Sequence, residues 1–474
     1  MRKTIERATT TVLILCISLV GAQAGATDGY FDSTWAGGGR LLFGGDVHNP
    51  NRATDIREVL QEADGNLLLG GDVDPGGFDY WWLGELRPDG TPAPTFGESN
   101  GLATSCHLLS NLCTGDGLSA FALQGDGRID VADDKTLTRT TARAQALDTA
   151  GVFGGTGHVS LQVPIDTVQG NTTYASAIAE TSSGQWIVAG GGYYDAGASG
   201  DFAAIRLNAN FSLDATFNQT GTFSGGQLVA FDGGGSNSDG ARAVIVQSDG
   251  RIVLAGYASP NDEAAFARLN ANGSLDSTFG GGGTGTMILG GLDGNFTSRS
   301  VKVDRAGRML LATRPAAGVK ELVPNLHVVR LTVDGVPDSA FGTSGIFKVP
   351  VPSTCAGGAA ANVVALDSAG RILVAGVCGI SVSEQVFLVA RLHGDDGSLD
   401  TDFGIDGFGY GKFDASSTYD EATDIVVDGS GHPIVVGVSQ PAGGIRRAGV
   451  ARLTYDLIFT NDFEVVPRGY LRGQ

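Results

Sequence analysis

One phrase of amino acids returns along this chain at an almost constant interval. Its clearest copy opens with Asp249-Gly250-Arg251-Ile252 and closes with Leu275-Asp276-Ser277-Thr278-Phe279-Gly280. The opening glycine recurs at positions 65, 127, 184, 250, 307, 370 and 431, and the closing aromatic at positions 35, 96, 153, 217, 279, 341 and 403. A period of this length predicts repeated units that stack in a row or close into a ring.

Each repeat is typical of β structure. Residues 241–247 alternate around Val244 and Val246, and residues 251–256 form a second β-rich run after an Asp-Gly turn. Asp-Gly between two such runs indicates a hairpin, because glycine accepts positive φ. A third run ends at residues 267–269, a fourth covers residues 285–289, and no helical period interrupts them. Four strands per repeat is the content of one propeller blade.

The two ends of the chain complement each other. Residues 32–39 match the end of a repeat, and residues 40–43 form one strand; residues 449–453 match a third strand, with no full glycine-rich fourth strand after them. We therefore predict an all-β, seven-bladed β-propeller of four-stranded blades, closed by pairing of the N-terminal strand with the last repeat. Closure would remove two exposed sheet edges. An open solenoid of the same repeats is the alternative.

These phrases resemble the delta-60 repeat family over residues 29–464. The matching residues are 249–252, 267–269 and 275–280, with copies in other units. Unit two departs most, with Arg143-Ala144 in place of Arg-Leu and Ala150 in place of the aspartate. The resemblance implies a secreted or envelope bacterial protein with a propeller-like fold and no established activity. Residues 457–464 are similar to a short tail of some exported bacterial proteins, although Phe463 also fits the last repeat's own ending.

The N-terminus predicts export. Arg2, Lys3 and Arg7 precede an apolar run over residues 10–20, and small residues follow at 22–26. This pattern indicates a signal peptide over residues 1–26. The apolar run is too short for a transmembrane anchor, and no later segment has 18 unbroken apolar residues. We expect a propeller domain over 27–464, a tail over 465–474, and a location outside the cell or in its envelope.

The cysteines agree with export. Four remain after cleavage, and their positions suggest the pairs Cys106–Cys113 and Cys355–Cys378, although four cysteines allow three connectivities. Zinc ligation is the alternative, but the spacing is not that of a zinc site and only His107 lies nearby.

Residues that recur in most repeats are expected to build the fold. An arginine precedes leucine at the end of the third run, and an aspartate precedes the aromatic. We predict that these residues form a structural latch: Arg206, Arg268, Arg330, Arg391 and Arg452 with Asp214, Asp276, Asp338 and Asp400. The alternative is a ring of arginines that contacts a ligand.

No local motif assigns a chemistry. The formal net charge of −20 argues against nucleic-acid binding. Calcium has only a weak signal, in residues 126–133 and in the oxygen-rich loop 232–240, and we assign neither metal nor cofactor. The chain has no Gly-x-Ser-x-Gly elbow and no His-Glu-x-x-His pair, so no catalytic residue is assigned. Propeller sites assembled from several blades would leave no such motif.

Irregular segments are the better candidates for function. Tyr80, Trp81 and Trp82 concentrate aromatics that other units lack, which makes them candidates for ligand binding. Packing of Tyr80 and Trp82 between blades is the favoured interpretation, because large aromatic side chains are usually buried. The sequence predicts a binding or scaffolding module whose partner is a protein, a peptide or a glycan. A secreted polysaccharide hydrolase or lyase with a site in the central channel, and a structural envelope protein, are the alternatives.

Overall fold

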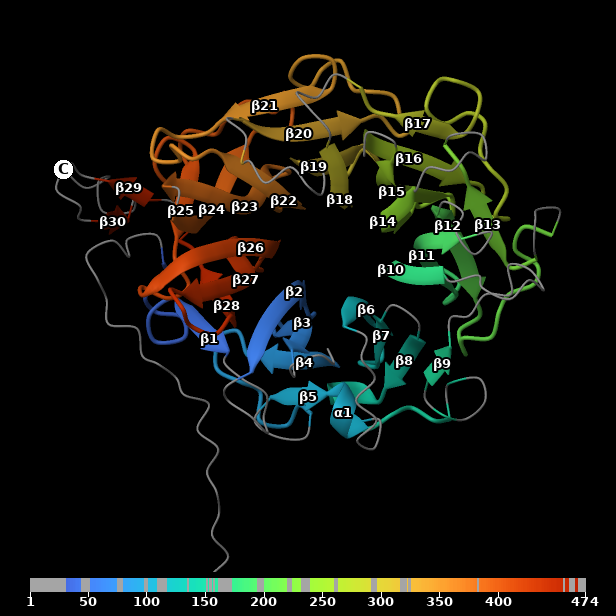
Figure 1. Cartoon of the computed structure of the whole chain (residues 1–474), viewed down its shortest axis with the longest axis horizontal. Helices are drawn as coiled ribbons and strands as arrows, with labels where there is room; N and C mark the ends of the chain where they lie inside the picture. The colour runs from blue at the N-terminus through green and yellow to red at the C-terminus, as the bar shows by residue number, and fades with distance from the viewer. Residues whose placement is uncertain are drawn as a thin grey trace, which may run out of the picture.

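The computed structural model describes the larger part of the chain. The described residues are 31–43, 52–74, 80–97, 101–108, 117–133, 136–150, 152, 156, 158–160, 173–193, 200–219, 224–231, 239–259, 263–290, 296–315, 322, 325–381, 383–454, 457–459 and 465–467. The predicted signal peptide, Cys113 and Phe463 lie outside these residues. Figure 1 shows the strands arranged as sheets around a centre.

Five blades are separate four-stranded antiparallel sheets. Blade 1 contains β2 (Ala53–Gln61), β3 (Leu67–Asp74), β4 (Tyr80–Leu86) and β5 (Leu102–Thr104). Blade 2 contains β6 (Leu118–Leu123), β7 (Ile129–Asp133), β8 (Thr136–Thr140) and β9 (His158–Ser160). Blade 3 contains β10 (Thr173–Glu180), β11 (Trp186–Tyr193), β12 (Gly200–Leu207) and β13 (Gly226–Val229). Blade 4 contains β14 (Gly240–Val246), β15 (Ile252–Ala258), β16 (Glu263–Leu269) and β17 (Thr286–Ile288). Blade 5 contains β18 (Phe296–Val303), β19 (Met309–Pro315), β20 (Asn325–Leu331) and β21 (Ile346–Pro350).

The remaining repeats form one eight-stranded sheet instead of two separate blades. Its members are β22 (Ala359–Leu366), β23 (Ile372–Ser381), β24 (Glu384–Leu392), β25 (Phe408–Gly411), β26 (Ser417–Val427), β27 (Pro433–Pro441), β28 (Arg447–Arg452) and β1 (Arg40–Phe43). The sequence predicted seven separate four-stranded blades, whereas the structure shows five, and the last two repeats share one sheet. A single parallel bridge between Gln385 and Tyr419 joins β24 to β26, and it merges two groups of four strands into one sheet.

The first strand of the chain pairs with the last repeat. β1 runs antiparallel to β28, with Arg40 opposite Ala451 and Phe43 opposite Ala448. This is the pairing that the sequence predicted for residues 40–43. The partners lie far apart in the sequence, and β1 completes this half of the sheet as its outer strand.

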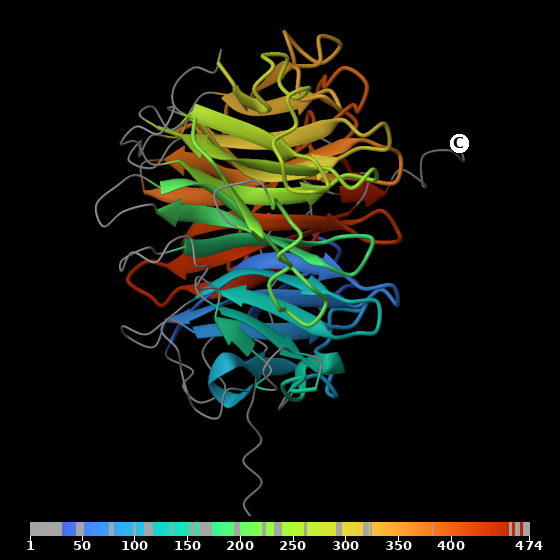
Figure 2. The ribbon, with the colours of Figure 1, turned by 90° about the vertical axis from the view of Figure 1, so that its right-hand side faces the viewer.

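Most of the core lies between neighbouring sheets. One buried cluster joins Ile187 and Phe217 of blade 3 to Leu254 and Leu269 of blade 4. Another joins Leu41 of β1 and Val450 of β28 to residues of blade 1. In the side view of Figure 2 the strands run across the thickness of the disc, which leaves the loops at its two faces. We call the face with the Asp-Gly turns, such as residues 248–251, the turn face, and the opposite face the mouth face.

A β-bulge interrupts the innermost strand of every repeat. The extra residues are Arg57, Ser119, Ser176, Arg242, Arg299, Asn362 and Thr423, all of them polar. The repeated glycine of the second strand makes room for the bulge, because a Cβ on Gly256 would run into the carbonyl oxygen of Gly240. Bulges change the direction of a side chain. In blades 2 and 5 the same position of the second strand is Asp133 and Thr313, so the bulge forms there without the glycine.

The other described elements are short. A single turn of helix, α1 (Ser105–Leu108), follows β5, and a 3-10 turn, η1 (Ala142–Ala144), follows β8. β29 (Leu457–Phe459) and β30 (Val465–Pro467) form a separate hairpin. Among the described residues, no helix has the length and apolar character to cross a membrane.

Candidate functional site

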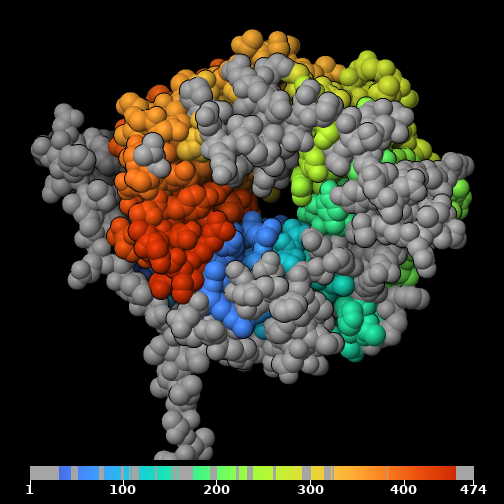
Figure 3. All heavy atoms as spheres, viewed as in Figure 1, coloured from blue at the N-terminus to red at the C-terminus, as the bar shows by residue number. Residues whose placement is uncertain are grey.

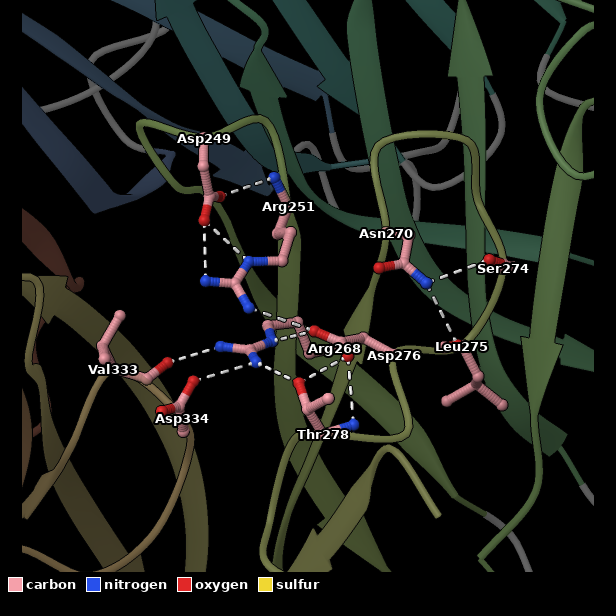
Figure 4. Close-up of polar contacts among 10 residues, drawn as sticks. All are labelled: Asp249, Arg251, Arg268, Asn270, Ser274, Leu275, Asp276, Thr278, Val333 and Asp334. Carbon is pink, nitrogen blue, oxygen red and sulfur yellow. Dashed lines mark hydrogen bonds and ion pairs between the residues drawn. The ribbon is translucent and has the colours of Figure 1, made fainter. Parts of the chain in front are cut away.

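The recurring arginine lies at the centre of a polar network at each blade boundary. Figure 4 shows the copy at Arg268, which is fully buried at the end of β16. Its Nε lies 2.7 Å from Oδ2 of Asp276, and its Nη2 donates to Thr278 at 3.1 Å. The guanidinium carbon lies 4.9 Å from the centre of the Phe279 ring. Arg268 at the end of β16 therefore contacts both Asp276 and Phe279 in the loop that follows the strand.

The carboxylate of this network is strongly ionised. Burial raises the pKa of Asp276, but the hydrogen bonds from the Thr278 hydroxyl and N–H and the charge of Arg268 outweigh it and lower the pKa to about 2. The Asp276 side chain therefore keeps its negative charge at pH values at which an ordinary aspartate is protonated.

The same arginine reaches the next blade. Arg268 Nη1 donates to the carbonyl oxygen of Val333 at 2.5 Å, and Nη2 lies 3.2 Å from Asp334 Oδ1. The Phe279 ring packs under Gly335 in the same turn, where a Cβ would overlap the ring. The Arg268 network therefore joins blade 4 to blade 5, and Figure 4 shows both sides of this boundary.

Other predicted latch residues repeat this geometry. The distance from arginine Nε to aspartate Oδ2 is 2.8 Å for Arg206 with Asp214, Arg330 with Asp338, and Arg391 with Asp400. Arg206 and Arg330 also donate to carbonyl oxygens of the following repeat, those of Ala271 and Gly394.

Arg452 finds its partner at the other end of the chain. Its Nη1 lies 3.5 Å from Asp32 Oδ2, and its Nη2 lies 2.8 Å from Asp428 Oδ2. The Asp32 N–H donates to the Arg452 carbonyl at 2.9 Å, as the Asp276 N–H does to Arg268. Residues 32–35 therefore supply the closing phrase of the last repeat, the role for which the sequence also allowed Phe463.

Blade 2 corrects the expectation drawn from Arg143. The arginine at the end of its third strand is Arg139, whose Nε lies 2.7 Å from Oδ1 of Asp130. Its Nη1 donates to the Ala209 carbonyl, and the ring below its guanidinium is Phe211, which comes from blade 3. Sequence comparison missed Arg139 because its aspartate lies on β7 and not in the following loop.

Arg143 instead forms an ion pair between blades 1 and 2 in which the positive and negative partners have exchanged blades. Glu85 occupies the place of the arginine at the end of β4, and Arg143 Nη1 lies 2.9 Å from its Oε1. The N–H of Gly97 donates to the Arg143 carbonyl just as Gly280 donates to that of Asp334. The ion pair between blades 1 and 2 is thus a copy of Arg268–Asp334 with exchanged charges.

The centre of the ring holds carboxylates that do not follow the repeat. Figure 3 shows this centre hollowed in the space-filling view. Glu58 Oε2 accepts the N–H of Phe121 in blade 2 at 3.1 Å, and Asp424 Oδ2 accepts the N–H of Val59 in blade 1 at 2.9 Å. Each carboxylate thereby satisfies a backbone donor on the inner edge of a neighbouring sheet.

These two carboxyl groups have perturbed acidities. Burial and the charge of Asp424 raise the pKa of Glu58 to about 7, against the lowering effects of the Phe121 N–H and Lys302. Burial raises the pKa of Asp424, and Lys302 lowers it. Lys302 is exposed on β18. Its positive charge lowers the pKa values of carboxyl groups on two other sheets, those of β2 and β26. Such perturbed groups in a central position are candidates for chemistry as well as for structure.

Tyr80, Trp81 and Trp82 lie inside the protein. Their exposed fractions are 1%, 0% and 4%. Tyr80 and Trp82 pack with β1 and β28, and Trp81 packs toward blade 2. This is the packing that the sequence favoured for Tyr80 and Trp82, and none of the three offers an exposed ring to a ligand.

One predicted disulfide is present. Cys355 and Cys378 are bonded, and both are buried. The Cys106 side chain and Cys113 lie outside what the structure describes, as does most of the loop 232–240. Within the described part, no group of three or more His, Cys, Asp or Glu side chains gathers to hold a metal ion.

The comparisons with known proteins support a β-propeller repeat protein. The family model described as "Domain of unknown function (DUF5122) beta-propeller" matches residues 181–217, 247–279 and 370–403. These matches cover the phrases of three repeats. They include three of the five latch arginines, Arg206, Arg268 and Arg391, and three of the four latch aspartates, Asp214, Asp276 and Asp400. No curated protein matches the sequence.

Several solved structures resemble this chain at low sequence identity. A protein of unknown function from Dyadobacter fermentans is 10% identical with a TM-score of 0.38, covering 88% of this chain and 98% of its own. The polysaccharide lyase Uly1 is 12% identical with a TM-score of 0.43, covering 84% and 90%. Drosophila Semaphorin 2a is 8% identical with a TM-score of 0.46, covering 85% and 74%. Likeness at this level carries no argument about function.

Proposed function

We propose that this chain is an exported, closed, seven-bladed propeller that acts as a binding or scaffolding module through its mouth face. The binding role is inferred from a contrast between charged residues that recur from repeat to repeat and polar residues that do not. On the turn face, the recurring arginines are engaged in latches. The irregular polar residues instead occupy the bulges of the innermost strands, where Arg57 and Arg242 are exposed.

Closure is supported by contacts that recur where the ends of the chain meet. The Ala36 N–H donates to Asp89 O at 2.9 Å, as Gly280 N–H does to Asp334 O. At the centre, Thr423 Oγ1 donates to Ile56 O at 2.7 Å, as Asn362 Nδ2 does to Ala422 O. The boundary from β26–β28 to blade 1 therefore has the spacing of an ordinary blade boundary. On this basis we count β22–β25 as a sixth blade and β26–β28 with β1 as a seventh.

Export is supported by two independent features. Residues 1–26 have the pattern of a signal peptide. The Cys355–Cys378 disulfide requires an oxidising compartment to persist.

The binding role is tested by capture from the secreted and envelope fractions of the source. The mature protein is immobilised beside an Arg57→Ala/Arg242→Ala variant of the mouth face and an Arg305→Ala variant of the turn face. We expect a component retained by the wild type and Arg305→Ala and lost from the double variant. Equal retention by all three proteins, or by none, would refute binding through the mouth face.

A polysaccharide hydrolase or lyase is the second candidate, and Glu58 with Asp424 favours it. A carboxyl group with a pKa near 7 can exchange a proton at neutral pH, as general acids and bases do. Release of reducing ends or unsaturated products from a polysaccharide panel, lost in Glu58→Gln, would support catalysis. Activity that survives this substitution would exclude the site.

A further inference from the structure

We propose that Arg242, Tyr257 and Tyr174 form a binding site for the carboxylate groups of an acidic glycan, at the mouth face between blades 3 and 4. This inference rests on the proposed binding function and names the ligand class and the subsite. Arg242 is the bulge residue of β14, and Tyr174 occupies the start of β10 in the neighbouring blade.

Arg242 is the charged group of this site. It is exposed, and its guanidinium carbon lies 5.4 Å from the centre of the Tyr257 ring. Among the described residues it forms no ion pair, in contrast to Arg57, whose Nε contacts the Asp72 carboxylate. A guanidinium held on a ring and not neutralised by a carboxylate keeps its fork of donors for an anion.

Two tyrosine hydroxyls converge beside it because glycine leaves the space. A Cβ on Gly240 would lie 2.7 Å from the Tyr174 hydroxyl oxygen and 3.0 Å from that of Tyr257. A Cβ on Gly191 would overlap the Tyr174 ring itself. Tyr174 and Tyr257 are both half-buried, so their rings are held while part of each stays accessible.

This combination fits a sugar acid. The guanidinium can bind a carboxylate through two hydrogen bonds, tyrosine hydroxyls can exchange hydrogen bonds with sugar hydroxyls, and ring surfaces pack on the C–H face of a pyranose. The net charge of −20 repels a polyanion elsewhere, which would confine binding to a local cationic site. An acidic peptide offers the carboxylate without the ring and its hydroxyls.

The test is calorimetric titration of the mature protein with a galacturonate hexamer, its methyl-esterified form and a glutamate hexapeptide. Arg242→Ala and Tyr257→Phe are compared with Arg305→Ala as the matched control, because Arg305 is also exposed and lies on the turn face. Thermal unfolding of each variant verifies folding.

We expect the hexamer to bind the wild type and Arg305→Ala alike, with affinity at least about tenfold weaker in Arg242→Ala. The methyl ester should not bind. Equal affinity in Arg242→Ala, binding of the ester, or binding of the peptide as tightly as the hexamer would each overturn the inference. If no probe binds while the capture experiment still depends on the mouth face, the ligand class is wrong and the proposed function stands.

Discussion

Arg143 and Glu85 face each other across the boundary between blades 1 and 2 with their charges exchanged relative to Arg268 and Asp334 at the boundary between blades 4 and 5. Glu85 is almost completely buried and also accepts a hydrogen bond from Asn66 at 2.6 Å. The exchanged charges distinguish the boundary between blades 1 and 2 from the similar boundary between blades 4 and 5. This difference favours the native order of the repeats, because like charges would face each other if one of these blades packed against the wrong neighbour.

Charge exchange tests this pair. Glu85→Arg places two arginines together, and Arg143→Asp places two carboxyl groups together, so each should lower the free energy of unfolding by about 2–4 kcal/mol. The double variant restores opposite charges and should recover about 1–3 kcal/mol of that loss. Urea unfolding of the four proteins measures the coupling. Additive losses would mean that the pair does not interact.

The Arg268 network should contribute to stability beyond its charge. Arg268→Ala leaves Asp276 without its buried partner and breaks the bond to Val333, so we expect a loss of about 3–5 kcal/mol. Arg268→Lys should recover little, because an ammonium group cannot reproduce the fork of donors. Arg305→Ala is the control: it removes one hydrogen bond of an exposed side chain, to the Ser368 carbonyl, and should change stability by less than about 1 kcal/mol. Unchanged melting of Arg268→Ala would contradict a latch.

Glu58 should make stability depend on pH near neutrality. Because its pKa is raised from 4.5 to about 7 in the fold, its favourable contribution is complete below pH 4.5 and is lost as the pH rises through about 7. Glu58→Gln should therefore flatten the decline between these values, by on the order of 1–3 kcal/mol. Melting temperatures measured across this range provide the comparison. A variant whose profile parallels the wild type would assign the decline to other groups.

The disulfide should stabilise the β22–β23 region. Cys355 and Cys378 are 23 residues apart, and closing a loop of this size typically contributes about 2–4 kcal/mol. The Cys355→Ala/Cys378→Ala variant should melt lower than the wild type and lose its sensitivity to reductant. Identical melting of the wild type with and without reductant would show that the bond contributes nothing measurable.

Removal of residues 27–43 tests closure. The deletion leaves β28 without its partner β1, removes Asp32 from Arg452 and exposes a sheet edge. We expect a lower melting temperature and association of the truncated protein, measured by light scattering. Addition of a synthetic peptide of residues 29–43 should reverse the association. A truncated protein as stable and monomeric as the full chain would favour an open arrangement.

The sequence alone determined the features that lie within one repeat. The Asp276 carboxylate, its turn and Phe279 lie within about a dozen residues of Arg268, and a closely similar spacing recurs after Arg206, Arg330 and Arg391. Hairpin turns and the number of strands in a repeat could be predicted because short-range turn chemistry and β alternation depend on neighbouring residues. The pairing of residues 40–43 with the last repeat is inferred instead from residues 32–43 and 449–453, which each match a different part of one repeat. The Cys355–Cys378 bond joins two positions of a single unit.

Only the tertiary structure decided what happens between repeats. The partners Arg268 and Val333 are 65 residues apart, and Glu85 and Arg143 are 58 apart, so the angle between sheets selects them. Burial of Trp81, the use of Arg139 in blade 2 and the meeting of Tyr174 with Tyr257 depend on this packing in the same way. A repeat specifies its own strands through local hydrogen bonds, whereas the side chains at its boundaries acquire their partners only when neighbouring sheets close on them.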